Sequence, residues 1–184
     1  MGIFIKKYIA IFLLALCVLV LPFGAYSFAE SPIESKIKAA FVVNFARFIN
    51  WPADVLDDKA APLVICTVGV EEDNQSFVGV ESKKIKGHPV VLQVFNTLKG
   101  SSGAPCQLLY VKGVDQNSLQ SYLEHGDPTP VVTIGESEGF ARLGGTIEFV
   151  KIKDRLSFKI NNSAAKERRL QINASLLDLA EEVY

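Results

Sequence analysis

Four short, largely apolar runs constrain the fold of this chain more than any other feature of its sequence. They cover residues 62–69, 89–95, 106–111 and 129–135, and the first of them, PLVICTVG, is almost wholly apolar. Runs of this kind are typical of strands that are covered on both faces. Helical or polar segments separate them, as in βαβ units. The sequence therefore predicts a single α/β domain with a mixed, mostly parallel sheet flanked by helices on both faces.

The C-terminal part of the chain has a different pattern. Apolar and polar residues alternate over 146–152 and 155–160, and Lys153-Asp154 between them predicts a β-hairpin with one solvent-exposed face. Residues 161–167 and 174–183 are expected to form closing helices. The domain expected over residues 30–184 thus ends in a hairpin and closing helices.

A helix is predicted directly after residue 30. Ser31 is a favourable N-cap, Pro32 suits the first helical position, and Glu34 completes the capping pattern. Apolar residues then recur at intervals of three and four, which predicts one apolar stripe along the helix: Ile33, Ile37, Phe41, Phe45 and Phe48. Trp51-Pro52 ends the helix, because the residue before a proline is pushed out of helical backbone space.

Residues 1–29 have the three parts of a secretory signal. Lys6-Lys7 is the positive region, residues 8–21 form an uninterrupted apolar run, and Ser27-Phe28-Ala29 places small residues at a cleavage site. The alternative is an uncleaved membrane anchor. A spanning helix needs about 20 apolar residues, and Pro22 interrupts this run before that length.

The charge balance argues against one class of partner. The chain has 19 Lys and Arg against 20 Asp and Glu, and cleavage of the signal leaves 17 basic residues against 20 acidic ones. The exported domain then has a net charge near −3, with no basic excess to neutralise phosphates. We therefore expect no nucleic-acid partner.

The exported domain keeps two cysteines, Cys66 and Cys106. Disulfides persist outside the cytoplasm, and two cysteines allow a single pairing. A closed loop of about 40 residues would stabilise the fold by about 4 kcal/mol on the chain-entropy model. The alternative is a pair of buried free thiols. A metal site is disfavoured, because neither His88 nor His125 has a spacing that would recruit it.

One motif has the form of a catalytic element. Gly135-Glu136-Ser137-Glu138-Gly139 matches the G-x-S-x-G nucleophile elbow and follows a predicted strand. That elbow needs a helix after the serine and a histidine later in the chain. Here another strand follows and both histidines precede the serine. The sequence also lacks a G-x-G-x-x-G or P-loop lysine motif. We expect neither enzymatic activity nor a cofactor.

Four residues are candidates for contact with a partner or ligand. Arg47 and Trp51 lie at the end of the first helix, and Trp and Arg carry much of the binding energy of protein interfaces. The alternative is that Arg47 is an ordinary surface cation and Trp51 a core residue. Phe140 and Arg142, on the glycine-rich loop that follows Gly135, are the next candidates.

Three segments resemble the YfiR-like periplasmic family. The first is the helix end, Lys38-Ala39-Ala40-Phe41, Asn44-Phe45-Ala46-Arg47-Phe48 and Trp51-Pro52. The second comprises Val132-Thr133-Ile134-Gly135, Gly139-Phe140-Ala141, Gly144-Gly145 and Ile147. The third runs from Arg155-Leu156 through Phe158-Lys159-Ile160-Asn161 and Ala164-Ala165 to Leu179-Ala180. Together they span nearly all of the exported domain.

The resemblance implies a periplasmic repressor that binds the periplasmic domain of an inner-membrane diguanylate cyclase and lowers cyclic-di-GMP, with effects on biofilm formation. It also implies an outer-membrane protein that sequesters the repressor, and it is compatible with a homodimer. Cys66 and Cys106 fall where the family's long-range disulfide lies. The family's second disulfide is absent, since residues 137–146 contain no cysteine.

A second hypothesis is an envelope receptor for a small molecule that tunes a signalling partner. The two hypotheses differ in the surface they require. A receptor needs a pocket with convergent polar groups, whereas a repressor that acts by protein contact needs an apolar patch with a polar rim.

The signal hypothesis makes a direct prediction. If residues 1–29 are cleaved, the mature protein begins at Glu30 and is released from the cells by osmotic shock. N-terminal sequencing of the released fraction checks the site. Recovery of the intact chain in the membrane pellet would show that the segment is an anchor.

Overall fold

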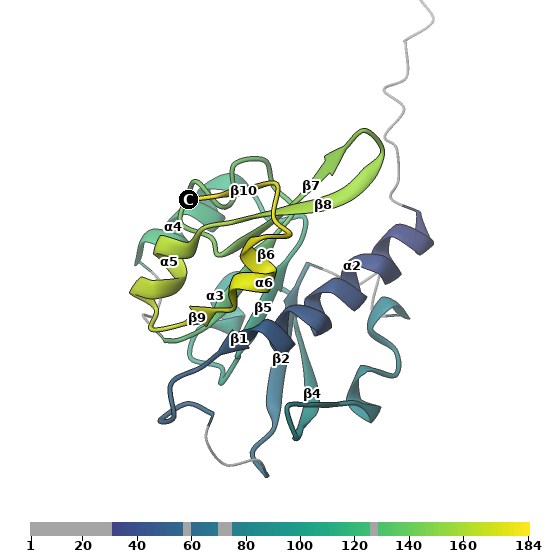
Figure 1. The fold of residues 1–184 in the computed structure, drawn as a ribbon, viewed down its shortest axis with the longest axis vertical. Coiled ribbons are helices and arrows are strands. Elements are labelled where there is room, and N and C mark those ends of the chain that lie inside the picture. The colour runs from purple at the N-terminus through teal and green to yellow at the C-terminus, as the bar shows by residue number, and fades with distance from the viewer. Residues whose placement is uncertain (1–30, 57–59, 70–74, 126–128) are drawn as a thin grey trace, which may run out of the picture. The chain divides into compact units, whose positions relative to one another are not determined.

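An eight-stranded sheet, in the order β10-β8-β7-β6-β5-β2-β4-β3, forms the centre of the computed structural model (Figure 1). The structure describes residues 31–184 except 57–59, 70–74 and 126–128. The predicted signal therefore lies outside the described residues, and Ser31–Tyr184 form one unit. No helix in the described part is long and apolar enough to cross a membrane.

The strands pair as expected for a mixed, mostly parallel sheet. Adjacent strands from β4 to β7 are parallel, β8 and β10 are also parallel, and the β3–β4 and β7–β8 pairs are antiparallel. The eight strands are β2 (Leu63–Val68), β3 (Lys84–Ile85), β4 (His88–Phe95), β5 (Leu108–Val111), β6 (Val132–Gly135), β7 (Ile147–Ile152), β8 (Arg155–Ile160) and β10 (Glu182–Val183). The predicted fold class is confirmed, including the hairpin at Lys153-Asp154.

Helices cover both faces of this sheet. The helical segments are α2 (Pro32–Phe45), η1 (Ala46–Phe48), η3 (Val80–Ser82), α3 (Leu98–Ser101), α4 (Gln116–His125), α5 (Asn162–Glu167) and α6 (Ala174–Leu177). Alternate residues of β2 enter two separate hydrophobic cores. Leu63 and Ile65 pack in the core beneath α2, whereas Val64 and Cys66 share a core with Leu119 of α4 and with a residue of α3.

Helix α2 begins as predicted, but its buried face is not the predicted stripe. The Ser31 hydroxyl accepts a hydrogen bond from the Glu34 amide at 3.1 Å, which caps the helix. The sheet meets Ala39, Val42 and Val43, whose small or branched side chains allow a close approach. Of the five stripe residues only Phe45 is buried, because the stripe lies along the side of the helix and does not face the sheet directly. Ile33 is 71% exposed and Ile37 is 44% exposed.

The end of the chain also differs from the expected closing helix. α5 has the predicted position, but α6 ends at Leu177, and Glu182–Val183 forms strand β10. The Glu181 and Tyr184 amides donate to the carbonyls of Phe158 and Ile160, each at 2.9 Å. The exposed edge of β8 thus supplies the backbone partners that a longer helix would have found within itself.

A two-stranded sheet joins the end of the first helix to the C-terminal segment. β1 (Ile49–Asn50) pairs with β9 (Gln171–Ile172) in antiparallel fashion, and the Asn173 amide donates to the Phe48 carbonyl at 2.8 Å. This pairing places α6 beside α2, although the two helices are far apart in the sequence.

A disulfide joins Cys66, in β2, to Cys106, which lies shortly before β5. Both residues belong to the core beneath α3 and α4. Next to the bridge, the Gln107 side-chain oxygen accepts from the Val64 amide at 2.7 Å, and the Gln107 amide donates to the Val64 carbonyl at 2.9 Å. The predicted pairing, rather than two buried thiols, is what the structure contains.

Removal of the bridge is predicted to destabilise the domain. Replacing Cys66 and Cys106 together by alanine should lower the free energy of unfolding by about 2–5 kcal/mol, because the unfolded chain regains the freedom of a long loop. Urea unfolding with and without reductant measures the effect. The wild type should respond to reductant and the double variant should not. Equal stability of the two proteins would contradict the prediction.

Candidate functional site

The loop between β6 and β7, residues 136–146, carries two of the predicted contact residues, Phe140 and Arg142. Phe140 is only 1% exposed. Its ring lies between the backbones of Gly135 and Gly145, where an added Cβ would come within 2.4 Å and 2.1 Å of ring atoms. The sequence predicted Phe140 as a contact with a partner or ligand. The structure shows instead that it is a buried anchor for the loop.

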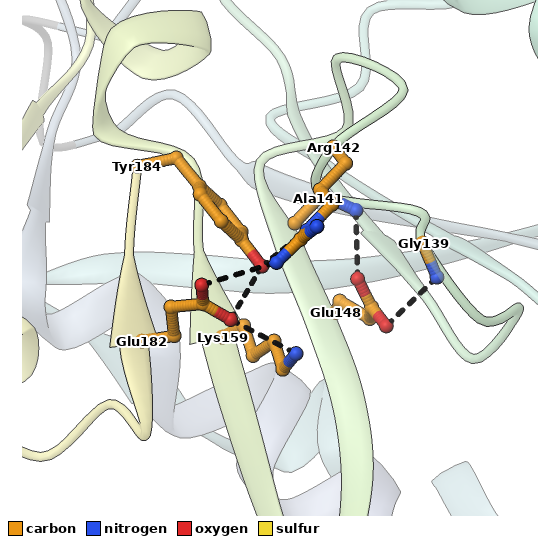
Figure 2. Close-up of polar contacts among 7 residues, drawn as sticks. All are labelled: Gly139, Ala141, Arg142, Glu148, Lys159, Glu182 and Tyr184. Carbon is orange, nitrogen blue, oxygen red and sulfur yellow. Dashed lines mark hydrogen bonds and ion pairs between the residues drawn. The ribbon is translucent and has the colours of Figure 1, made fainter.

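A buried carboxylate holds the same loop from the other side. Glu148 on β7 is 3% exposed, and its two oxygens accept hydrogen bonds from the amides of Gly139 and Ala141, both at 3.0 Å (Figure 2). The Asn161 side chain donates to the Ala141 carbonyl at 2.7 Å. Two backbone donors on one carboxylate compensate for its burial. Arg142 therefore projects from a backbone that is fixed on both sides.

The Arg142 side chain takes part in a charged cluster at the surface (Figure 2). Its Nε donates to the Tyr184 hydroxyl at 3.0 Å, and its Nη2 lies 3.3 Å from Glu182 Oε1. Tyr184 in turn donates to Glu182 Oε2 at 2.6 Å, and Lys159 Nζ lies 3.0 Å from the same oxygen. We call Arg142, Lys159, Glu182 and Tyr184 the Arg142 cluster.

The hydrogen bonds of this cluster shift the pKa values of its members. The Tyr184 hydroxyl, followed by Lys159, holds the pKa of the Glu182 carboxyl below its ordinary value of 4.5. Tyr184 and then Glu182 raise the pKa of Arg142. Arg142 is exposed and its partners are half-buried at the surface, so the cluster adds little stability. It instead presents two cations around one acid at a fixed place on the surface.

A second polar contact connects α2 to the start of the loop. Lys38 Nζ donates to Glu136 Oε2 at 2.7 Å and lies 3.3 Å from Glu34, and the Tyr110 hydroxyl donates to Glu136 Oε1. Lys38 is buried, which is unusual for a lysine unless it is paired. Lys38 is not among the contact residues predicted from the sequence. The available signal was its spacing of four residues from Glu34 on one helix.

The sideways stripe of α2 lines an apolar hollow. This hollow of 240 Å³ lies between α2 and α6, above β8. Its floor includes Phe41, Phe45 and Phe158, whose ring centroids are 5.0 to 6.2 Å apart. Ile37 lies at one rim and Leu179, which is 65% exposed, at the other.

A smaller hollow continues the first toward the β7–β8 hairpin. It has a volume of 190 Å³, shares Ile37 with the first, and is lined by Ile33 and Leu156 together with charged residues. Glu34 and Lys151 lie on its rim, 3.8 Å apart. We call the two hollows together the α2 groove. It combines an apolar centre with a polar end.

The structure separates the four predicted contact residues. Arg47 is exposed on η1. Trp51 is half-buried against the core beneath α2, and its ring nitrogen is buried with no hydrogen-bond partner among the described residues. No contact that we find in the described part of the chain joins this pair to Arg142. Among the same residues, no group of His, Cys, Asp and Glu side chains could hold a metal ion.

Comparisons with known proteins bear on both the fold and the family. A family model described as YfiR/HmsC-like matches residues 35–181. No curated protein matches the sequence. The solved structures that resemble the chain include an ABC domain in complex with L-Trp from Streptococcus pneumoniae, at 12% identity and a TM-score of 0.53. That match covers 79% of this chain and 60% of the other.

A conserved domain protein from Vibrio cholerae O1 biovar El Tor is also similar, at 10% identity and a TM-score of 0.50. This match covers 82% of the chain and again 60% of the solved one. The chain thus spans about three fifths of the length of each of these structures. At such low identity the likeness concerns the fold alone.

The two residues of the loop should respond differently to alanine. Phe140→Ala is expected to lower the free energy of unfolding by about 3–5 kcal/mol, because it leaves a void between two backbone segments. Arg142→Ala should leave stability unchanged within error, since its side chain is exposed. Urea unfolding followed by circular dichroism compares them. An equally stable Phe140→Ala protein would show that the ring does not anchor the loop.

Proposed function

The chain belongs to the YfiR/HmsC-like family, and on that premise we propose that it is a periplasmic repressor of an inner-membrane diguanylate cyclase. Members of this family are periplasmic regulators of diguanylate cyclases rather than enzymes. The proposed action is protein contact: the repressor binds the periplasmic domain of the cyclase and lowers cyclic-di-GMP output.

The α2 groove is the observation that supports this proposal most. Ile33, Ile37 and Leu179 are large apolar side chains exposed to water along this groove. Ile37 and Leu179 line the hollow with the aromatic floor, and Ile33 lines the hollow that continues it. Exposed apolar surface grouped in this way is typical of protein interfaces, especially where charged residues rim it. Glu34 and Lys151 supply such a rim at one end.

The shape of the groove favours a helical segment of the partner. The groove follows the exposed stripe of α2, a helix of 14 residues, and α6 forms its opposite wall. An amphipathic helix that lies along it can place apolar residues at helical spacing against Ile37, Phe41 and Leu179. We propose that such a helix of the cyclase's periplasmic domain is the occupant.

Repression then requires that the cyclase bind the groove more tightly in its inactive state than in its active one. A regulator shifts a two-state target only by the difference between its affinities for the two states. A partner helix that is exposed in the inactive cyclase alone would meet this condition. Sequestration by an outer-membrane protein would act by competition for the free repressor.

Cellular cyclic-di-GMP tests the repressor function itself. Deletion of the gene should raise cyclic-di-GMP, and export of the protein from a plasmid should lower it again. Ile37→Glu and Leu179→Glu should abolish this complementation while the protein stays folded, because each places a charge in the groove without opening the core. Val78→Glu is the matched control, since Val78 is 79% exposed and lies outside the groove.

The outcomes separate the function from the surface. Unchanged cyclic-di-GMP after deletion would contradict the repressor function. If deletion raises cyclic-di-GMP but both groove variants complement like the wild type, the groove is not the contact. Arg47→Ala and Arg142→Ala then test the two other exposed candidates in the same assay.

A further inference from the structure

A crevice of 760 Å³ lies beyond the carboxyl ends of the parallel strands β2, β4 and β5. Its lining includes Gly69, Asn96 and Gly113, each within two residues of the end of one of these strands. The crevice does not touch the α2 groove, because its walls come from α3 and α4, which cover the opposite face of the sheet.

The course of the chain accounts for the position of this crevice. After β2 the chain returns to β4 through η3, whose Val80 packs in the core beneath α2. After β4 and β5 it runs through α3 and α4, which pack in the other core. The connections from neighbouring strands therefore diverge to opposite faces. In open α/β sheets, ligands bind in the crevice that such a divergence creates.

Backbone rather than side chains forms the floor between β2 and β5. Gly69 has a φ of +76°, and a Cβ at this position would lie 1.9 Å from the Lys112 carbonyl oxygen. The Lys112 amide is bonded to the Val68 carbonyl at 3.0 Å, so this close approach is part of the sheet. No larger residue fits at Gly69 without moving the Lys112 backbone, so the end of β2 stays close to the end of β5 here.

Polar side chains line much of the crevice, beside Leu98 and Val114, and the lining has almost no net charge. Hydroxyl and amide side chains predominate: Asn96, Thr97, Ser102, Asn117, Ser118 and Ser121. Lys99 and Asp115 are one cation and one acid. Tyr122, half-buried, adds an aromatic surface.

Hydrogen bonds within the walls disfavour an anion as ligand. The Thr97 hydroxyl accepts from the Gly100 amide at 3.1 Å, and Asp115 Oδ1 accepts from the Ser118 amide at 2.9 Å. The same Ser118 contacts hold the pKa of Asp115 below its ordinary value of 3.8, so this carboxylate stays ionised. At the N-termini of α3 and α4, one backbone amide is thus already bonded to a capping side chain. One of these caps, Asp115, is negatively charged.

We propose that this crevice binds a small uncharged polyhydroxylated molecule, a mono- or disaccharide. Sugar hydroxyls both donate and accept, as the serine, threonine and asparagine groups of the walls do. The volume lies within the range of about 300–1,000 Å³ that small-molecule sites occupy. The proposal is independent of the cyclase contact, because the groove and the crevice share neither residues nor a face of the sheet.

Titration of the exported protein, labelled with ¹⁵N, tests the site. Glucose, N-acetylglucosamine and their β-1,4-linked disaccharides are the probes, and alanine and inorganic phosphate represent zwitterions and anions. At least one sugar should shift the amide signals of α3 and α4, and neither charged probe should do so. Shifts with alanine or phosphate but with no sugar would overturn the ligand class, and no shift with any probe would overturn the site.

Two tryptophan variants on α4 locate the binding. Ser121→Trp places a ring in the crevice and should weaken sugar binding about tenfold or more, which corresponds to about 1.4 kcal/mol. Gln120→Trp is the matched control, because Gln120 is the exposed neighbour that does not line the crevice. Lys99→Met should leave the affinity within a factor of about two, since no charge pairing is proposed. Equal binding by both tryptophan variants, or loss of binding in Lys99→Met, would overturn the proposal.

Discussion

Burial of β2 on both faces is the constraint on which the rest of this domain depends. Its side chains alternate between two cores, and it pairs with β4 on one edge and with β5 on the other. A shift of register by one residue would exchange the two faces and would move Cys66 away from Cys106. The helices on each side, and therefore the groove and the crevice, take their positions from this strand.

Much of the fold could be predicted because its signals are local. The buried strands are short apolar runs, and the cap at Ser31 depends on three neighbouring residues. The buried face of α2 could not be predicted, because the helix is apolar over more than one side. Val42 and Val43 pack closely against the sheet, and the aromatic residues of the apolar stripe lie on the side of the helix near α6. Strand β10 has two residues and depends on the edge of β8, which no local pattern reveals.

The candidate site was predicted less well than the fold. A glycine-rich loop suggests an exposed and adaptable segment, yet Gly135 and Gly145 make room for a buried ring. The anchor from Glu148 and the position of Lys38 are long-range contacts, so the sequence around each residue carries little sign of them. Arg142 is exposed as expected, but its partners come from the far end of the chain.

The ion pair between Lys38 and Glu136 has a thermodynamic consequence. It joins the helix that lines the α2 groove to the first residue of the loop that bears Arg142. A ligand that moves this helix and a ligand that moves the loop would be linked through this pair if each of them changes its geometry. Such linkage is reciprocal: the free energy by which the first ligand alters the binding of the second equals that by which the second alters the first.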